Sequence, residues 1–322
     1  MMTNKEVYQK TIGFSIRRLL WDILAFLAAA ALCALGYFVA EKTADKGLIG
    51  LAVGGIIGII ALVIFLRYIS YTYKAGQIAM MTRGVSEGTL PEDVIGEGKR
   101  VVKDNFATVA IFFAATGVIK GIFNQLARLI TNVGERVGGD TGSSVASAIS
   151  TVIQVIVSYL CDCCLGWVFY RKGIKPAKAT CEGAVLFFKH GKTLAKNLGR
   201  VFGMGLASLA VIGGAFTGIF YLVASRFPAI FGELARELQN VSADSKIPAA
   251  LTDPNTLMWV AAGIGALILW GIIHSAFIRP FVLVGVLRNY IASGADDIPT
   301  EESFALLDSK SAKFKKLHEE AA

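Results

Sequence analysis

Long apolar stretches alternate with polar stretches along the whole chain. Each apolar stretch is about 20 residues or longer, the length that an α-helix needs to cross the hydrocarbon core of a bilayer. The pattern therefore predicts an all-α polytopic integral membrane protein with about six transmembrane helices. The expected spans are approximately 19–40, 48–70, 105–130, 145–170, 198–225 and 257–279.

The expected spans pair into three hairpins, and a polar segment with helical spacing follows each pair. We expect one membrane domain covering 1–322, of which 280–322 forms a cytoplasmic tail. Pro280 is expected to bend the helix at the end of the last span, because proline lacks a backbone donor and clashes with the preceding turn.

Lysines recur four residues apart in these polar segments, at Lys99 and Lys103 and again at Lys192 and Lys196. Residues four apart share one face of a helix. The segments also carry apolar residues at Phe187, Phe188, Leu194, Phe304, Leu307 and Phe314. The pattern is typical of basic interfacial helices, whose lysines contact lipid phosphate on the inner leaflet. Loop helices that pack on the spans give the same pattern, and the sequence leaves both interpretations open.

Basic residues concentrate in alternate segments between the spans. The N-terminus, 71–104, 171–197 and the tail are rich in lysine and arginine, whereas the segments between them are nearly neutral. The positive-inside rule assigns basic segments to the cytoplasm. We therefore expect both termini in the cytoplasm, 226–256 outside, and the protein in the plasma membrane.

The composition is that of a membrane protein. Hydrophobic residues make up 54% of the chain and charged residues only 17%, compared with about 25% charged residues in soluble domains. The 34 glycines suit helices that pack closely in lipid. The net charge is +8, and the basic residues lie beside the apolar stretches. Anionic lipid headgroups of the inner leaflet are therefore the expected partner, and nucleic acid is not.

Five cysteines stand at positions 33, 161, 163, 164 and 181. An odd number with three clustered members does not indicate a disulfide framework. The cluster of Cys161, Cys163 and Cys164 lacks the paired spacing of zinc sites, and no histidine lies near it in the sequence. We expect no metal and no cofactor. Lipidation of these three cysteines, at a cytoplasmic helix end, is left open.

The sequence carries no recognisable catalytic motif. It contains no G-x-S-x-G, no H-E-x-x-H and no P-loop. The three histidines are far apart, and no polar segment is long enough to hold a soluble catalytic domain. We therefore do not expect an enzyme.

Asp162 lies well inside an expected span, where the bilayer makes a charge costly, whereas Asp22 of the first span is close to the inner interface. Tyr159 precedes it by three residues and so shares its face of the helix. A carboxylate beside an aromatic ring provides the charge balance and the cation–π contact that a quaternary ammonium ion needs. Alternatively, Asp162 pairs with a neighbouring cation such as Arg279 or His274 and holds helices together.

The last span carries a second polar pair. Trp270 and His274 stand four residues apart, with Arg279 beyond them. This face either lines a substrate path together with Asp162 and Tyr159 or packs against another helix.

Several short elements occur in an order known from one family. The run Cys161-Asp162-Cys163-Cys164 closes a helix, and the other elements are Ile64-Phe65-Leu66-Arg67, Leu90-Pro91, Thr180-Cys181-Glu182-Gly183-Ala184, Leu186-Phe187-Phe188, Lys196-Asn197, Ser275-Ala276-Phe277 and Asp296-Asp297. Over roughly 64–318 the chain resembles the choline transporter-like family. That family usually has more spans than this chain has room for.

The resemblance implies a carrier of choline or a similar small organic cation such as ethanolamine. The alternative is a non-transporting membrane-organising protein, or a subunit of a membrane complex, that binds the inner leaflet through basic amphipathic helices. A carrier needs a solvated cavity reached by Asp162, whereas the alternative needs a closed core with its charges on the surface. The sequence leaves a homo-oligomer open.

Overall fold

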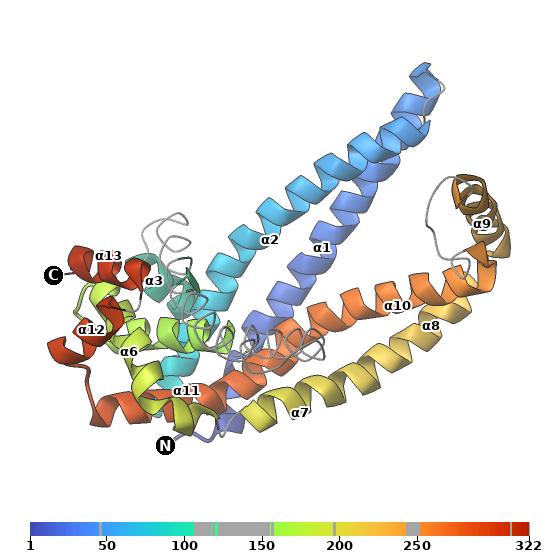
Figure 1. Cartoon of the computed structure of the whole chain (residues 1–322). Coiled ribbons are helices and arrows are strands. Elements are labelled where there is room, and N and C mark those ends of the chain that lie inside the picture. Colours follow the sequence, from blue (N-terminus) through green and yellow to red (C-terminus); the bar gives the residue numbers. More distant parts are fainter. Residues whose placement is uncertain are drawn as a thin grey trace, which may run out of the picture. The chain divides into compact units, whose positions relative to one another are not determined.

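The computed structural model describes residues 1–44, 47–105, 117, 120–121, 155, 158–195, 198–242, 252–309 and 311–321. All regular secondary structure in this part of the chain is helical (Figure 1). Where the sequence predicts one domain, the structure divides the chain into two compact units. Unit 1 comprises Met1–Leu198 and Pro280–Ala322, and unit 2 comprises Gly199–Arg279.

Among the described residues, three helices are long and apolar enough to cross a membrane. They are Asn4–Thr43, Val201–Ala224 and Pro254–Asp296. These helices cover the first, fifth and sixth expected spans. The all-α class is therefore confirmed, together with helices of membrane-spanning length and composition.

The other expected spans are described only in part. The second lies in α2 (Gly47–Ser86), in which the side chains are described without a gap over the apolar stretch Ala52–Phe65. The third and fourth fall largely outside the described residues. Gly121, expected inside the third span, lies beside Lys313 of the predicted tail, because a Cβ atom at Gly121 would be 2.8 Å from Lys313 Cδ. Six spans in three hairpins therefore stay a prediction.

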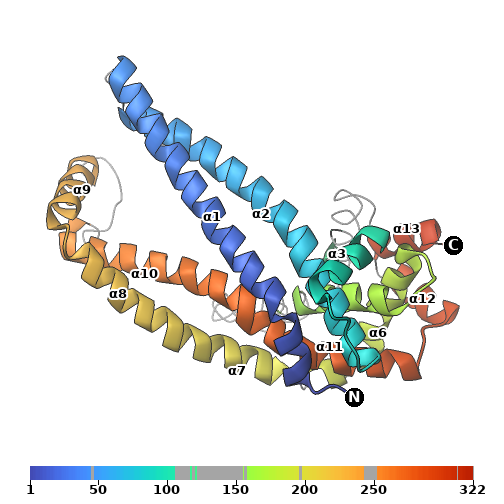
Figure 2. The ribbon, with the colours of Figure 1, turned by 180° about the vertical axis from the view of Figure 1, so that it is seen from behind.

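Helices α1 (Asn4–Ala44) and α2 form a hairpin with closely packed backbones (Figures 1 and 2). A Cβ atom added at Gly50 would lie 2.1 Å from the carbonyl oxygen of Gly36. One added at Gly54 would lie 2.5 Å from the carbonyl oxygen of Leu32. Glycine is thus required for this approach, which is the packing that small residues provide between helices in lipid. The outer faces of the hairpin are apolar and exposed.

Helix α2 continues to Ser86, through residues that the sequence assigns to a cytoplasmic segment. Its C-terminal part packs on the N-terminal part of α1, where Gln77 donates from Nε2 to Ser15 Oγ at 2.9 Å and to the carbonyl oxygen of Thr11 at 3.3 Å. Every residue from 75 to 82 is buried there, so protein surrounds this part of α2 on all sides.

The amphipathic helix α3 (Val94–Asn105) packs on α2. Gly98 and Val102, four residues apart, are buried on one face, and Lys103 is exposed. Gly98 lets the two backbones approach, since a Cβ atom there would lie 2.9 Å from the carbonyl oxygen of Gly76.

The C-terminal residues of unit 1 are a folded part of its core, although the sequence predicts a polar tail over 280–322. Helix α11 (Arg279–Asp296) is buried along most of its length, including Val284 and Leu287. Helices α12 (Glu301–Asp308) and α13 (Ala312–Ala321) follow it and pack on α6 (Pro176–Ala195). Whether these residues are cytoplasmic stays a prediction.

The apolar faces of α12 and α13 are covered by protein. Phe304, Leu307, Phe314 and Leu317 cluster with Cys181, Ala184 and Val185 of α6. These two helices therefore pack on α6, another of the basic polar segments, and contact with lipid or with the spans stays a prediction. The side chains of Phe187, Phe188 and Leu194 lie outside the described residues.

Unit 2 is a second hairpin. Helices α7 (Leu198–Ser208) and α8 (Gly214–Ala224), joined by the π-helical turn η1 (Leu209–Gly213), run beside α10 (Pro254–Ile273) (Figure 1). A further helix, α9 (Pro228–Ser242), lies at the end where α8 stops and α10 begins (Figure 2). The sequence analysis assigned no helix to this segment.

The chain does not leave the helix at Pro280. The π-helical turn η3 (His274–Ile278) directly precedes α11, and the helical run extends from Pro254 to Asp296. A π turn interrupts the regular hydrogen-bond ladder at the place where proline would otherwise break it.

Candidate functional site

Asp162 forms an ion pair with a lysine from another helix. It lies in the helical segment 158–170, and its Oδ1 is 2.7 Å from Nζ of Lys74 in α2. Asp162 is only 3% exposed, whereas the Lys74 side chain is 33% exposed. A buried carboxylate needs a compensating charge, and Lys74 supplies one.

Lys74 is a partner that sequence reasoning missed. The sequence analysis named Arg279 and His274 as candidates, and both belong to unit 2. Nothing in the spacing of the sequence relates α2 to segment 158–170, because the pair depends on how distant helices pack.

The residues that share the face of Asp162 are in contact with protein. Tyr159 and Phe169 are both buried. At Gly166, the Thr82 hydroxyl donates a hydrogen bond of 3.4 Å to the carbonyl oxygen, and a Cβ atom would lie 2.4 Å from Cδ1 of Leu287. Segment 158–170 therefore packs tightly between α2 and α11.

The other two candidate residues, Trp270 and His274, lie together in unit 2. Their ring centroids are 5.1 Å apart. Trp270 donates from Nε1 to Ser208 Oγ at 3.1 Å, which joins α10 to α7. Within unit 2 this pair therefore stabilises the hairpin.

The four lysines expected at lipid headgroups have different surroundings. Lys99 places Nζ 4.9 Å from the centroid of the Tyr73 ring, a cation–π contact within unit 1. Lys103 is exposed. The side chain of Lys192, and Lys196 altogether, lie outside the described residues.

A buried acid that the sequence analysis did not single out, Glu182, holds α6 to segment 158–170. It is 2% exposed and accepts a 3.0 Å hydrogen bond from Trp167 Nε1. Arg171 contacts both of its oxygens, at 2.8 and 3.2 Å. This network satisfies the carboxylate on two sides and is structural, because each of its polar contacts is with the protein itself.

Most of the cysteines around this network are buried. Cys163, Cys164 and Cys181 are buried, and Cys161 is half-buried. Burial, together with the nearby charges of Asp308 and other acids, raises the pKa of Cys181 to about 12. The thiolate is the form that binds metal and attacks electrophiles, so Cys181 is unreactive at neutral pH. Among the described residues, no cluster of three or more His, Cys, Asp or Glu side chains could hold a metal ion.

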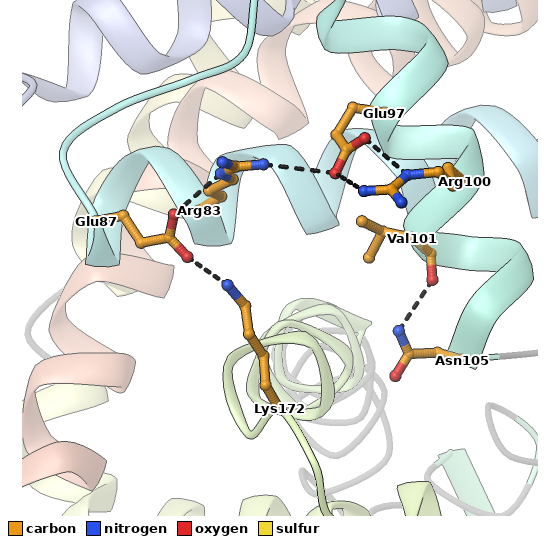
Figure 3. A network of polar contacts seen from close by, with 7 residues as sticks. All are labelled: Arg83, Glu87, Glu97, Arg100, Val101, Asn105 and Lys172. Atoms are coloured by element: carbon orange, nitrogen blue, oxygen red, sulfur yellow. Dashed lines mark hydrogen bonds and ion pairs between the residues drawn. The ribbon is translucent and has the colours of Figure 1, made fainter.

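A cavity of about 450 Å³, lined by both charged and apolar side chains, lies between the C-terminal part of α2, helix α3 and residues 169–173. Figure 3 shows Arg83, Glu87, Glu97, Arg100 and Lys172, charged side chains that line it. Glu87 contacts Arg83 at 3.0 Å and Lys172 at 2.5 Å. Glu97 contacts Arg100 at 2.7 Å and Arg83 at 3.5 Å.

The two glutamates of this cavity are held in their ionised form. The hydrogen bond from Lys172 is the main cause that lowers the pKa of Glu87, and the hydrogen bond from Arg100 is the main cause for Glu97. Acids and bases alternate and neutralise each other around the wall, so the cavity favours neither a cation nor an anion. The ion pairs around the cavity hold α2, α3 and the end of segment 158–170 together.

No protein-family model, curated protein or solved structure matches the chain. The resemblance to the choline transporter-like family therefore depends on the sequence elements alone, and the function has to be argued from the geometry.

Proposed function

We propose that the protein is a non-transporting membrane protein that organises anionic lipid around the base of unit 1. The base is defined as α3, α6, α12 and α13. The observation that carries the proposal is the ion pair between Asp162 and Lys74. Asp162 is the acidic residue that suggested a cation site, and Lys74 provides it with a partner inside the protein.

Transport of choline or a similar organic cation is the function that the sequence resemblance implies. A choline ion at Asp162 would have to displace the Lys74 ammonium group from a contact of 2.7 Å. Lys74 would then lose this contact with a carboxylate, which should cost about 1–2 kcal/mol because its side chain is 33% exposed and partly solvated. The ion pair therefore weighs against a cation site in this conformation.

The surface of the base supports contact with anionic headgroups. Exposed lysines lie on α3, before and within α6, and on α13; they are Lys103, Lys175, Lys178, Lys315 and Lys316. Each lysine near a negatively charged leaflet contributes about 1 kcal/mol of attraction. Because the apolar faces of α12 and α13 are covered by α6, these helices would act through charge and not by insertion into the acyl region.

The proposal includes the orientation expected from the sequence. The base would lie on the cytoplasmic side of the plasma membrane, with both chain termini there and α9 on the opposite side. Six spans in three hairpins would complete the membrane part, with the two hairpins described here as members.

Uptake of radiolabelled choline by purified protein in sealed vesicles tests the proposal against the carrier hypothesis. We expect no saturable uptake above that of protein-free vesicles. Saturable uptake by the wild-type protein that disappears in Asp162→Asn, with the variant still folded, would overturn the proposal and support a carrier.

A further inference from the structure

Helix α9 is fixed at the end of the unit 2 hairpin. It starts four residues after α8 ends at Ala224, and it packs on α10. Its residue Ala235 is 2% exposed. Near its C-terminus, Gln239 donates from Nε2 to the carbonyl oxygen of Thr252 at 3.3 Å. The helix is therefore held against the hairpin through its middle and its C-terminal part.

An exposed apolar stripe runs along α9 and the residue before it. Phe227, Ile230 and Leu234 are 54%, 61% and 46% exposed. Their spacing of three and four residues places them on one face of a helix. Arg236 is exposed on the opposite side, and Glu233 is exposed between Arg236 and the stripe. The helix is thus amphipathic, and α10 does not cover its apolar stripe.

The surroundings of α9 have the features of a membrane–water boundary. Tyr221 of α8 stacks on Trp259 of α10 with centroids 4.1 Å apart, and its hydroxyl donates to Asn255 Oδ1 at 2.9 Å. Paired Tyr and Trp side chains at span ends are typical of membrane interfaces. Asp253 caps α10 by accepting a 2.8 Å hydrogen bond from the Thr256 N–H, as expected for a helix end in a polar environment.

The apolar stripe continues the lipid-facing surface of the hairpin. Leu222 and Val223, at the end of α8, are 65% and 53% exposed, and Phe227 follows them after a short turn. A surface that faces lipid along α8 would therefore pass without a break onto the stripe of α9. Because the two apolar surfaces are continuous, lipid is the partner expected to cover the stripe.

We propose that α9 is an interfacial helix, whose stripe of Phe227, Ile230 and Leu234 inserts at the boundary between headgroups and acyl chains at that end of the hairpin. Helices of this kind lie in the plane of the interface with the apolar face buried. The charged residues of α9 are two glutamates and one arginine, so insertion depends on apolar contact and not on anionic lipid. The helix would anchor the hairpin at a fixed depth.

Site-specific photocrosslinking of the full-length protein in phosphatidylcholine vesicles tests this inference. The photoreactive residue p-benzoylphenylalanine replaces Ile230 or Leu234 on the stripe, and Ala229 or Arg236 as matched controls on the opposite face. All four positions are exposed, so the substitutions do not disturb a core. We expect phospholipid adducts at Ile230 and Leu234, in yields several-fold above those at Ala229 and Arg236.

Equal yields at all four positions would overturn the inference, because the helix would then not be oriented by lipid. Crosslinks from Ile230 and Leu234 to a second copy of the chain would also overturn it and would identify a protein interface. The vesicles contain no anionic lipid, so the result does not depend on whether the base of unit 1 binds anionic headgroups.

Discussion

The ion pair between Lys74 and Asp162 predicts an asymmetry between two single substitutions. Lys74→Met leaves the carboxylate, 3% exposed, without its cation, which should destabilise the fold by about 3–5 kcal/mol, the usual cost of breaking a buried pair. Asp162→Asn leaves a lysine whose side chain is 33% exposed. Water solvates that ammonium group in part, so the cost should be only about 1–2 kcal/mol.

Unfolding of the detergent-solubilised protein, followed by tryptophan fluorescence, measures these costs. The double variant Lys74→Met/Asp162→Asn carries neither charge and should be more stable than Lys74→Met alone by about 2 kcal/mol. Lys172→Met is the matched control, because it removes an ion pair with Glu87 whose side chains are 73% and 35% exposed. That control should cost at most about 1 kcal/mol.

Two results would refute this reasoning. A larger loss in Asp162→Asn than in Lys74→Met would mean that the acid makes stabilising contacts that the lysine does not share. Additive losses in the double variant would mean that the two charges do not interact.

Three further predictions concern other parts of the molecule. Gly54→Leu should destabilise the α1–α2 hairpin by about 1–3 kcal/mol in the same unfolding assay, because its Cβ would lie 2.5 Å from a backbone oxygen; Gly218→Leu, where nothing lies within 4 Å, should not. Burial lowers the pKa of the His318 imidazole, but the carboxylates of Asp308 and Glu301 outweigh burial and raise this pKa above 6.5. Hydrogen-exchange protection of α13 should therefore be greatest below pH 6.5 and fall as the pH rises through the raised pKa, and a pH-independent protection would contradict this. Cys181 should resist maleimide at pH 7 until the protein is unfolded, as mass spectrometry of the labelled protein would show; rapid labelling of the native protein would contradict its burial.

Helices of spanning length could be predicted from the sequence because they depend on local composition. The apolar stretches of α1, α8 and α10 are continuous, and their outer faces are exposed in the structure. A helix of this kind can be predicted from its own sequence, without knowledge of the helices that it packs on. Local composition did not reveal the place of α11, whose apolar residues alternate with polar ones and are buried in unit 1 at the end of a continuous helical run.

The candidate site could be predicted only in part. Asp162 stood out because a charge in an apolar stretch is unusual, and the structure shows it buried and paired. Its partner Lys74 could not be found, since the contact depends on packing between distant segments. Helix α9 was missed for a different reason: its apolar residues are spaced as on one helix face, but charged residues interrupt them within a segment that reads as a loop.

Selective contact with anionic lipid tests the proposed function most directly. Energy transfer from the tryptophans to a fluorescent acceptor on phosphatidylserine is compared with transfer to the same acceptor on phosphatidylcholine, in mixed vesicles holding the full-length protein. We predict greater transfer to phosphatidylserine at low salt. The difference should vanish as the Debye length falls from about 30 Å at 0.01 M salt to about 3 Å at 1 M, and it should shrink in the variant Lys103→Gln/Lys315→Gln/Lys316→Gln. Equal transfer to both lipids at low salt would contradict the account.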